Sequence, residues 1–322
     1  MVSLSDHARV KLAILADDFT GACDAAAPFA GAGFRTLVAL APPVGWPNGV
    51  DVLSVDLDLR SADAAHAQLV MCAAASALRE QARLFVKIDS TLRGPIAALV
   101  EGALEGSRAV HAVVAPAFPE QGRHYRAGRL GSDGASVHEL LASLAHRCRI
   151  VDDPEEVEPV RGALLVGSGG LARRLAGPGV VPLPSLGGAV LVVAGSPAPA
   201  TQAQLQRLPP SADVLRTPPS ADRDAGEAAA RLADAVRTRA DRAPCPGLLV
   251  LTGGQTARLV CERLHVHSLE VLGEVQPGIP VGRLRGGVWD SVTVVTKAGG
   301  FGGPDALLDA LRLLGPSCVG TP

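Results

Sequence analysis

Short apolar runs alternate with longer amphipathic stretches along most of this chain, and this alternation limits the fold more than any other feature. Most of the runs end at a turn rich in Gly, Asp or Ser, as buried strands of a parallel sheet do. Because strands alternate with helices, the sequence predicts an α/β protein with mostly parallel, doubly wound sheets. We expect strands at Lys11–Ala16, Thr36–Leu40, Val52–Val55, Leu84–Lys87, His111–Ala115, Ala163–Val166, Val190–Ala194, Leu248–Leu251 and Val292–Thr296.

The stretches between these runs have the apolar spacing or the capping residues of helices. Thr20 is predicted to cap a helix that ends near Ala32. Further helices are expected over Ala62–Gln81, Ala135–His146, Ser168–Ala176 and Gly226–Ala240, and from Thr201, Gln255 and Pro304 onward.

The length of 322 residues is enough for about two domains. Residues 177–188 are rich in Gly and Pro without a periodic pattern, so we interpret them as a linker between domains of residues 1–176 and 189–322. Each domain is expected to hold a mostly parallel doubly wound sheet. Since such sheets bind ligands beyond the carboxyl ends of their strands, we expect the active-site cleft between the two domains.

The charge composition excludes several classes of partner. The 30 Lys and Arg residues nearly balance the 32 Asp and Glu residues, so neither nucleic acid nor a membrane is expected as a partner. No apolar run approaches the roughly 20 residues of a membrane helix, and residues 1–10 lack the apolar core of a signal peptide. A cytoplasmic protein is therefore expected.

Common catalytic motifs are absent from the sequence. There is no GxxxxGKS/T phosphate loop, no complete GxGxxG fingerprint, no HRD or DFG kinase motif and no HExxH zinc motif. The six Cys residues form no CxxC pair, and His265 and His267 are interpreted as surface or edge residues rather than as a metal pair. We predict no metal site built from protein ligands.

Small residues follow three successive strands of the C-terminal half: Gly195-Ser196, Thr252–Thr256 and Lys297–Asp305. Small residues let the backbone approach an anion, which free N–H groups and the helix dipole then hold. A single turn of this kind is more simply a tight connection, but three on successive units favour a nucleotide. The candidate nucleotide-binding residues are Ser196, Gly253, Gly254, Gln255, Thr256, Lys297, Gly299, Gly300 and Gly302.

Three polar clusters follow strands of the N-terminal half: Asp17–Ala22, Lys87–Gly94 and Pro116–Arg123. Either aspartate of the first cluster could simply cap a helix, and any one cluster could be an ordinary polar loop. Three at strand ends favour a pocket for a small hydroxylated acid. Its carboxylate could be bound by Arg93 in a bidentate manner or by the helix start at Thr20-Gly21. The candidate catalytic residues are Asp18, Asp17 and Lys87, and the candidate substrate-binding residues are Thr20, Asp89, Ser90, Thr91, Arg93, Gln121 and Arg123.

Lysine is scarce in this chain, because only three of the 30 basic residues are Lys. A compact ammonium and a planar guanidinium differ in shape and in the hydrogen bonds that they donate, so a retained Lys indicates a role that Arg cannot fill. Chance is an equally good explanation for any single Lys. Lys87 and Lys297 lie in the polar clusters just described, whereas Lys11 merely begins a strand.

Six motifs, in this order, resemble the four-carbon acid sugar kinase family over residues 11–314: ADDFTGACD, KIDSTLRG, APAFPEQGR, VVAGS followed by TQxQL, LTGGQTA and TKAGGFGGPDAL. The resemblance implies an N-terminal domain for a sugar acid such as threonate, erythronate or 3-oxotetronate, and a C-terminal domain for ATP. It implies ATP contacts at Ser196, Gly253, Gly254, Gln255, Thr256 and Gly299. It implies substrate-side roles for Asp17, Asp18, Lys87, Asp89, Ser90, Arg93, Gln121 and Arg123.

The expected reaction is therefore ATP-dependent phosphorylation of a sugar-acid hydroxyl, with Asp18 or Asp17 as the base and Mg²⁺ on the phosphates. The chain is shorter than usual members, with compressed stretches at 131–164 and 196–253, and Pro95 and Leu99 stand where Asn and an acidic residue are usual. These departures keep two alternatives open: a homologue that binds sugar acid or nucleotide without turnover, and a kinase for a different hydroxy acid. The sequence does not give the oligomeric state, and a homodimer is kept as a hypothesis.

Overall fold

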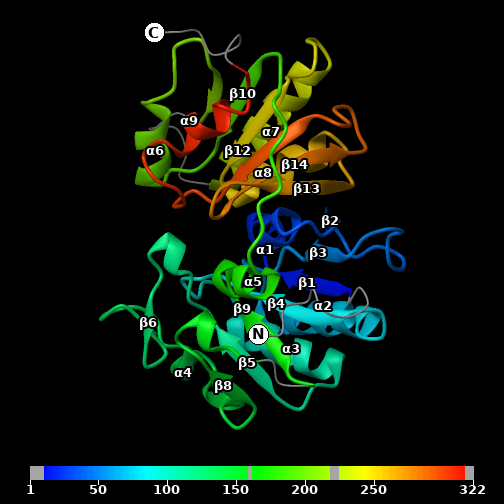
Figure 1. Cartoon of the computed structure of the whole chain (residues 1–322), viewed down its shortest axis with the longest axis vertical. Helices are drawn as coiled ribbons and strands as arrows, with labels where there is room; N and C mark the ends of the chain where they lie inside the picture. Colours follow the sequence, from blue (N-terminus) through cyan, green and yellow to red (C-terminus); the bar gives the residue numbers. More distant parts are fainter. Residues whose placement is uncertain (1–10, 159–161, 218–224, 316–322) are drawn as a thin grey trace. The chain divides into compact units, whose positions relative to one another are not determined.

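The computed structural model describes residues 11–158, 162–217 and 225–315. The chain divides into two compact units, residues 1–179 and residues 180–322 (Figure 1). The division falls inside the stretch 177–188 that we interpreted as a linker.

Unit 1 contains a parallel sheet in the strand order β2-β3-β1-β4-β9-β5-β8 (Figure 1). Its strands are β1 Leu12–Ala16, β2 Thr36–Ala39, β3 Val52–Asp56, β4 Arg83–Lys87, β5 Ala112–Ala115, β8 Cys148–Ile150 and β9 Leu164–Gly167. Its helices are α1 Phe19–Gly31, α2 Ala64–Leu78, α3 Ile96–Ser107, α4 Val137–Leu140 and α5 Gly169–Ala176. A small antiparallel pair, β6 Tyr125–Arg126 and β7 Arg129–Leu130, and the 3₁₀ turns Pro119–Gln121, Ala142–Leu144 and Pro154–Glu156 complete the unit.

Helices cover both faces of this sheet, as the successive residues Ile14 and Leu15 of β1 show by entering different cores. Ile14 of β1 lies in the core that includes Phe29 of α1, and this core also holds residues of α5. Leu15 lies in the core that includes Met71 of α2, and this second core also holds residues of α3. Unit 1 is thus a doubly wound α/β sheet, as the sequence predicted.

The connections from β1 change from one side of this strand to the other, which makes β1 the topological switch point of the parallel sheet. The chain leaves β1 for β2 and β3 on one side and returns to β4 on the other. The carboxyl ends lie in register, since Ala16 pairs with both Asp56 and Lys87, and Lys87 pairs with Gly167. In open parallel sheets the crevice outside such a switch point is where ligands bind, and the first two predicted clusters follow β1 and β4.

Unit 2 contains a mixed sheet in the order β11-β10-β12-β15-β14-β13. Its first four strands are parallel, whereas β14 is antiparallel to both of its neighbours. The strands are β10 Val190–Ala194, β11 Asp213–Arg216, β12 Leu248–Thr252, β13 Ser268–Gln276, β14 Ile279–Arg285 and β15 Thr293–Lys297. The helices are α6 Pro199–Leu205, α7 Ala225–Ala240, α8 Gly254–Arg263 and α9 Ala306–Leu311.

Several sequence-based expectations about elements were wrong or incomplete. Asp18, not Thr20, is the N-cap of α1, because its side chain accepts a hydrogen bond from the backbone of Gly21. The single helix expected over 135–146 is two short pieces, α4 and the 3₁₀ turn Ala142–Leu144. α6 begins at Pro199 rather than Thr201, and α9 begins at Ala306 rather than Pro304. The elements α3, β8, β11, β13 and β14 were not predicted.

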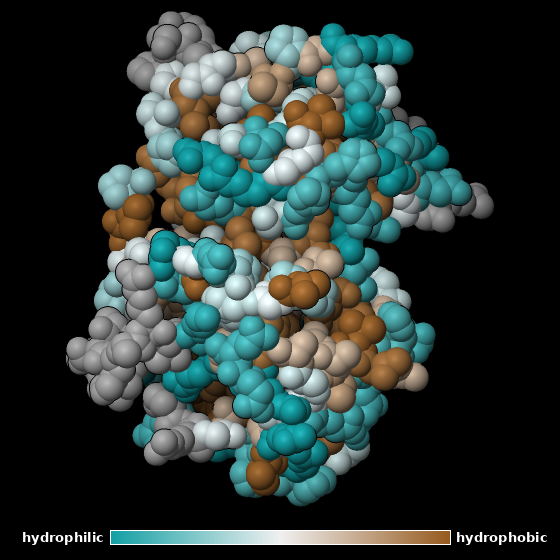
Figure 2. All heavy atoms as spheres, turned by 90° about the vertical axis from the view of Figure 1, so that its right-hand side faces the viewer, coloured by the Kyte–Doolittle hydropathy of each residue, from teal (hydrophilic) through white to brown (hydrophobic). Residues whose placement is uncertain are grey.

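Hydrophilic and hydrophobic residues are interspersed on the face of each unit that Figure 2 shows. Within the described ranges, none of the helices combines the length and the apolar character needed to cross a membrane.

Candidate active site

Arg60 links the ends of three strands in unit 1. Its Nε and Nη2 atoms donate to the two carboxylate oxygens of Asp17 at 2.9 and 2.8 Å, and its Nη1 donates to Oδ2 of Asp18 at 2.6 Å. The same Nη1 lies 3.9 Å from Oδ1 of Asp89. The sequence analysis missed Arg60, although the residue follows β3 at the same edge of the sheet as the predicted clusters.

Asp17 is an anchor for Arg60 rather than an exposed reactive group. Its side chain is 0% exposed. Burial raises the pKa of Asp17, against the opposing charge of Arg60. The pKa of Arg60 lies above its ordinary value, because the charges of Asp17 and Asp18 outweigh the burial that would lower it. The bidentate pair therefore fixes the position of the Arg60 guanidinium.

Asp18 is the more accessible of the two adjacent carboxylates, with 15% of its side chain exposed. Its Oδ1 accepts the backbone N–H of Gly21 at 2.8 Å, and its Oδ2 accepts the hydroxyl of Thr20 at 2.9 Å. The cap at the start of α1 and the contact with Arg60 thus hold one carboxylate at the end of β1.

Lys87 lies buried beside the start of α1, close to Gly21. Its Nζ donates to the carbonyl of Ile88 at 3.0 Å and lies 3.9 Å from Oδ2 of Asp24. Asp24 is a buried acid of α1 within the first sequence motif, and the sequence analysis did not select it. The ammonium of Lys87 is thus held by Ile88 and Asp24, and its charge acts to lower the pKa of the predicted Asp17.

Arg93 makes a bidentate contact, but with Asp89 of its own loop. Nε and Nη2 of Arg93 donate to the two oxygens of Asp89 at 2.7 and 2.9 Å, and the hydroxyl of Thr91 also donates to Asp89. Although burial works against it, the hydrogen bond from Arg93 and the charge of Arg60 hold the pKa of Asp89 below its ordinary value. The fork of Arg93 that we expected to hold a substrate carboxylate is thus engaged within the protein.

The third predicted cluster joins the second through Tyr125, whose hydroxyl donates to the backbone carbonyl of Ser90 at 2.8 Å. The backbone N–H groups of Gln121 and Arg123 both donate to the carbonyl of Phe118 at 3.0 Å, which closes the turn before β6. The Nε of Arg123 is buried without a hydrogen-bond partner among the described residues. Such a donor is available to a ligand.

In unit 2 the three predicted turns lie side by side. Ala194, Thr252 and Lys297, the last residues of β10, β12 and β15, pair in one row across the sheet. The turns that follow touch closely, because a Cβ atom on Gly299 would lie 1.9 Å from the hydroxyl of Ser196. Only glycine fits there, so the sequence pattern reflects a real close approach of backbone.

Lys297 is fully buried under its own loop. Its ammonium donates to the carbonyls of Ala298, Gly299 and Phe301 at 3.1, 3.0 and 3.1 Å, and to the hydroxyl of Thr201 at 3.2 Å. Burial lowers the pKa of Lys297 to about 8. We predicted Lys297 as a nucleotide-binding residue, and the structure directs its ammonium at protein oxygens.

Gln204 of α6 also binds the loop after β15, and the sequence analysis did not select it. Its buried amide nitrogen donates to the carbonyls of Phe301, Gly302 and Gly303 at 3.2, 3.2 and 2.9 Å. In a trans peptide the N–H points opposite to the C=O. Because two side chains hold the carbonyls on one side, the N–H groups on the other side can face an anion. They include those of Gly299, Gly300 and Gly303.

In the described part of the chain, His, Cys, Asp and Glu residues form no group of three or more that could hold a metal ion. Mg²⁺ in kinase sites is held mainly by phosphate oxygens and water with one or two carboxylates, so a bound nucleotide would supply most of its ligands. We therefore assign no residue of this chain to Mg²⁺.

Two family models match the chain. Residues 12–154 match a sugar-binding N-terminal domain, and residues 220–307 match a nucleotide-binding C-terminal domain.

Curated relatives match over nearly the whole chain. A D-threonate kinase from Bordetella bronchiseptica is 29% identical over 94% of this chain and 97% of the relative. A D-threonate kinase from Cupriavidus necator is 30% identical over the same shares. A 3-oxo-tetronate kinase from Pseudomonas fluorescens is 27% identical over 95% of this chain and 97% of the relative. The Bordetella alignment extends over 397 positions against 322 residues here, so that relative carries additional residues.

Solved structures agree with the fold. A Salmonella typhimurium protein described as a putative tRNA synthase has a TM-score of 0.76 at 20% identity, covering 95% of this chain and all of that one. A Haemophilus influenzae protein has a TM-score of 0.64 at 19% identity, covering 93% and 99%. Both likenesses concern the fold alone.

Proposed function

Because the chain belongs to the four-carbon acid sugar kinase family, we propose that it transfers a phosphoryl group from ATP to a hydroxyl group of a four-carbon sugar acid. Family membership makes it a phosphotransferase with an alcohol acceptor. The substrate itself is inferred from the relatives, because threonate and 3-oxo-tetronate are both four-carbon acids.

The main support for ATP binding comes from the loop after β15, whose backbone carbonyls are bound by buried side chains. Lys297 and Gln204 together bind the carbonyls of five loop residues: Ala298, Gly299, Phe301, Gly302 and Gly303. This arrangement supports a cradle of N–H groups for the phosphates of ATP, with Ser196, Gly253, Gly254, Gln255 and Thr256 on the neighbouring turns. In this proposal Lys297 is a positioning residue.

The aspartates of unit 1 supply the acid–base chemistry. Asp18 accepts the proton of the substrate hydroxyl group while the oxygen of that hydroxyl forms a bond to the γ-phosphorus of ATP. The bond between the γ-phosphorus and the β,γ-bridging oxygen breaks, which releases ADP. Asp17 positions Arg60, and Arg60 in turn holds the Asp18 carboxylate. Mg²⁺, when bound, neutralises phosphate charge.

The substrate carboxylate needs a cation that is not already engaged. Arg93 is engaged by Asp89, whereas Nε of Arg123 is buried without a hydrogen-bond partner among the described residues. We therefore assign the carboxylate to Arg123, beside Gln121. The wall of the substrate pocket is then formed by Asp89, Ser90, Thr91 and Arg93. The bottom of the pocket lies next to Lys87 and Thr20.

Release of ADP in the presence of a panel of four- to six-carbon hydroxy acids tests this function. We expect the highest kcat/KM with a four-carbon acid. Highest activity with a longer acid would favour the alternative of another hydroxy-acid kinase. Tight ATP binding without turnover of any acid would favour a binding protein.

Asp18→Asn tests the base. Asn still caps α1, so the variant should fold normally while kcat falls by a factor of about 100 or more. Asp63→Asn is the matched control, because Asp63 caps α2 in the same way, with its side chain accepting the N–H of His66. Normal turnover by Asp18→Asn would exclude this base.

The homodimer and the cytoplasmic location stay proposals. Light scattering of the purified chain would test the first, since a dimer has twice the mass of 32.8 kDa.

A further inference from the structure

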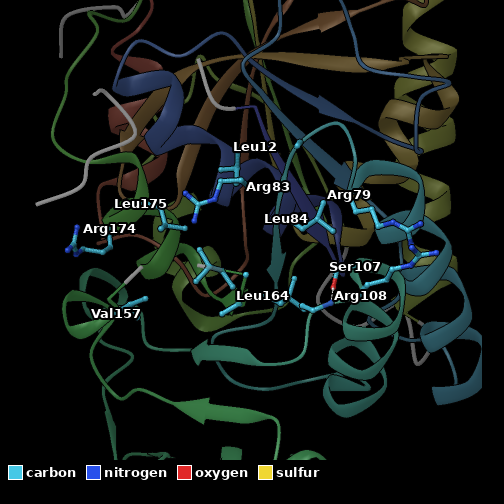
Figure 3. Close-up of a pocket in the computed structure, with 15 residues that line it drawn as sticks. Leu12, Arg79, Arg83, Leu84, Ser107, Arg108, Val157, Leu164, Arg174 and Leu175 are labelled. Atoms are coloured by element: carbon cyan, nitrogen blue, oxygen red, sulfur yellow. Dashed lines mark hydrogen bonds between the residues drawn. The ribbon is translucent and has the colours of Figure 1, made fainter. Parts of the chain in front are cut away.

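A pocket opens in unit 1 away from the residues of the candidate active site. Figure 3 shows the residues that line it. The pocket has a volume of about 450 Å³, within the usual range of small-molecule sites. Leu12, Arg83 and Leu164 begin β1, β4 and β9, so the pocket lies at the amino ends of these strands. The aspartates of the candidate active site follow the carboxyl ends, so the two sites are separate.

Among the described residues, four arginines and no acidic residue line this pocket: Arg79, Arg83, Arg108 and Arg174. Arg79 pairs with Glu80 and Arg174 with Glu155, but these glutamates are 81% and 74% exposed and compensate little charge. Arg83 and Arg108 have no carboxylate partner within the described ranges. The pocket is therefore electropositive, and an anion would remove this imbalance.

The remaining lining is mostly apolar. Figure 3 shows Leu84 and Leu164 between Arg79 and Arg108 on one side and Arg83 and Arg174 on the other. The other apolar residues of the lining are Leu12, Ala82, Ala109, Val157, Ala163, Leu165 and Leu175. A polyhydroxylated sugar acid fits this apolar lining poorly, because its hydroxyl groups would lose hydrogen bonds to water without gaining hydrogen bonds to the protein.

We propose that this pocket binds an amphiphilic organic anion, a carboxylate or a phosphate monoester attached to an apolar body. The apolar body lies on the leucines at the strand ends. The anionic group lies against Arg83 or Arg108, where a guanidinium fork can hold two of its oxygens.

Calorimetric titration of the full-length protein with four probes tests this site. Octanoate and octyl phosphate carry both parts of the ligand, 1-octanol carries only the apolar body, and inorganic phosphate carries only the charge. We expect one octyl anion to bind at least tenfold more tightly than 1-octanol and inorganic phosphate. The tighter of the two identifies the anionic group.

The double variant Arg83→Gln/Arg108→Gln should weaken that binding at least tenfold. Both side chains are on the surface, so the fold should survive, and thermal unfolding checks this. Arg149→Gln is the matched control, because Arg149 is exposed on β8 and does not line the pocket. Asp18→Asn should leave octyl-anion binding unchanged.

Three outcomes would overturn the proposal. One is that neither octyl anion binds. Another is that inorganic phosphate or 1-octanol binds as tightly as the octyl anions. The third is that the double arginine variant binds them as the natural protein does.

Discussion

Two of the three lysines of this chain are buried, and each lies among oxygen atoms. Lys297 donates to three carbonyls and a hydroxyl, and Lys87 lies beside Asp24 and the carbonyl of Ile88. A compact ammonium can be surrounded in this way, whereas a planar guanidinium with five donors cannot. Lys11, by contrast, is exposed over the ring of Trp46. The burial agrees with the interpretation that Lys87 and Lys297 fill roles that Arg cannot.

Titration of Lys297 should reveal its burial. Its pKa of about 8 in the folded protein lies below the ordinary value of 10.5, so the unfolded chain binds more protons between these pH values. The free energy of unfolding, relative to Lys297→Met, should therefore rise from pH 8 to pH 10, by at most about 1.4 kcal/mol per pH unit. Urea unfolding at each pH measures the difference. A difference that stays constant or falls would contradict this prediction, and NMR titration of the three lysine side chains gives a direct check.

Replacement of Arg60 should destabilise unit 1. In Arg60→Gln, Asp17 remains fully buried without its bidentate partner, and the loss of one member of a buried ion pair costs about 3–5 kcal/mol. The surface pair between Arg35 and Asp51 is the control, so Arg35→Gln should cost less than about 1 kcal/mol. Urea unfolding compares the two variants. Equal losses would show that the pair with Asp17 is not the source of the stability.

At the scale of elements, α3 shows why a helix can escape sequence analysis. The helix contains Gly102 and Gly106, which weaken a helical pattern. A Cβ atom at these positions would lie 2.3 Å from the carbonyl of Gln68 and 2.2 Å from that of Cys72, both in α2. The two helices pack so closely that only glycine fits. Gly102 and Gly106 thus weaken the helical pattern in the sequence, and the packing of α3 against α2 requires the same two glycines.

The loop after β15 depends on α6, and substitutions of Gln204 test this dependence. Gln204→Met removes the donor to three carbonyls, and Gln204→Glu places a negative charge against them. We expect the KM for ATP to rise about tenfold or more in the Glu variant, with a smaller rise in the Met variant and little change in kcat. Gln206→Glu is the control, since Gln206 is exposed at the end of the same helix.

A purely structural role for Gln204 predicts a different result. In that case both variants would unfold more easily while the folded fraction kept the natural KM for ATP. Thermal unfolding and steady-state kinetics on the same samples separate the two roles.

At the scale of the whole molecule, each unit has its own core and its own tryptophan. Trp46 lies in unit 1 and the buried Trp289 lies in unit 2. We proposed that residues 189–322 bind the nucleotide, and a ligand stabilises the part that binds it.

Single-tryptophan variants can therefore show which unit responds to ATP. With ATP at 100 times its Kd, the bound state gains about 2.7 kcal/mol. The unfolding transition reported by Trp289 in Trp46→Phe should move to higher temperature, and the transition reported by Trp46 in Trp289→Phe should move less. A larger shift at Trp46 would contradict the assignment of the nucleotide to unit 2.

The sequence by itself determined the α/β class, most of the strands and the turns at which the candidate site residues lie. It did so because apolar runs and the Gly or Asp residues that end them are local signals. Tertiary structure alone decided what several of these residues contact. Arg60 reaches Asp17 across 43 positions and Gln204 reaches the glycine loop across 97 to 99 positions, so no local pattern announces either contact. Lys297 combines both kinds of contact, since it donates to carbonyls one to four positions away and to Thr201 across 96 positions. Buried polar groups must find partners wherever the fold brings them.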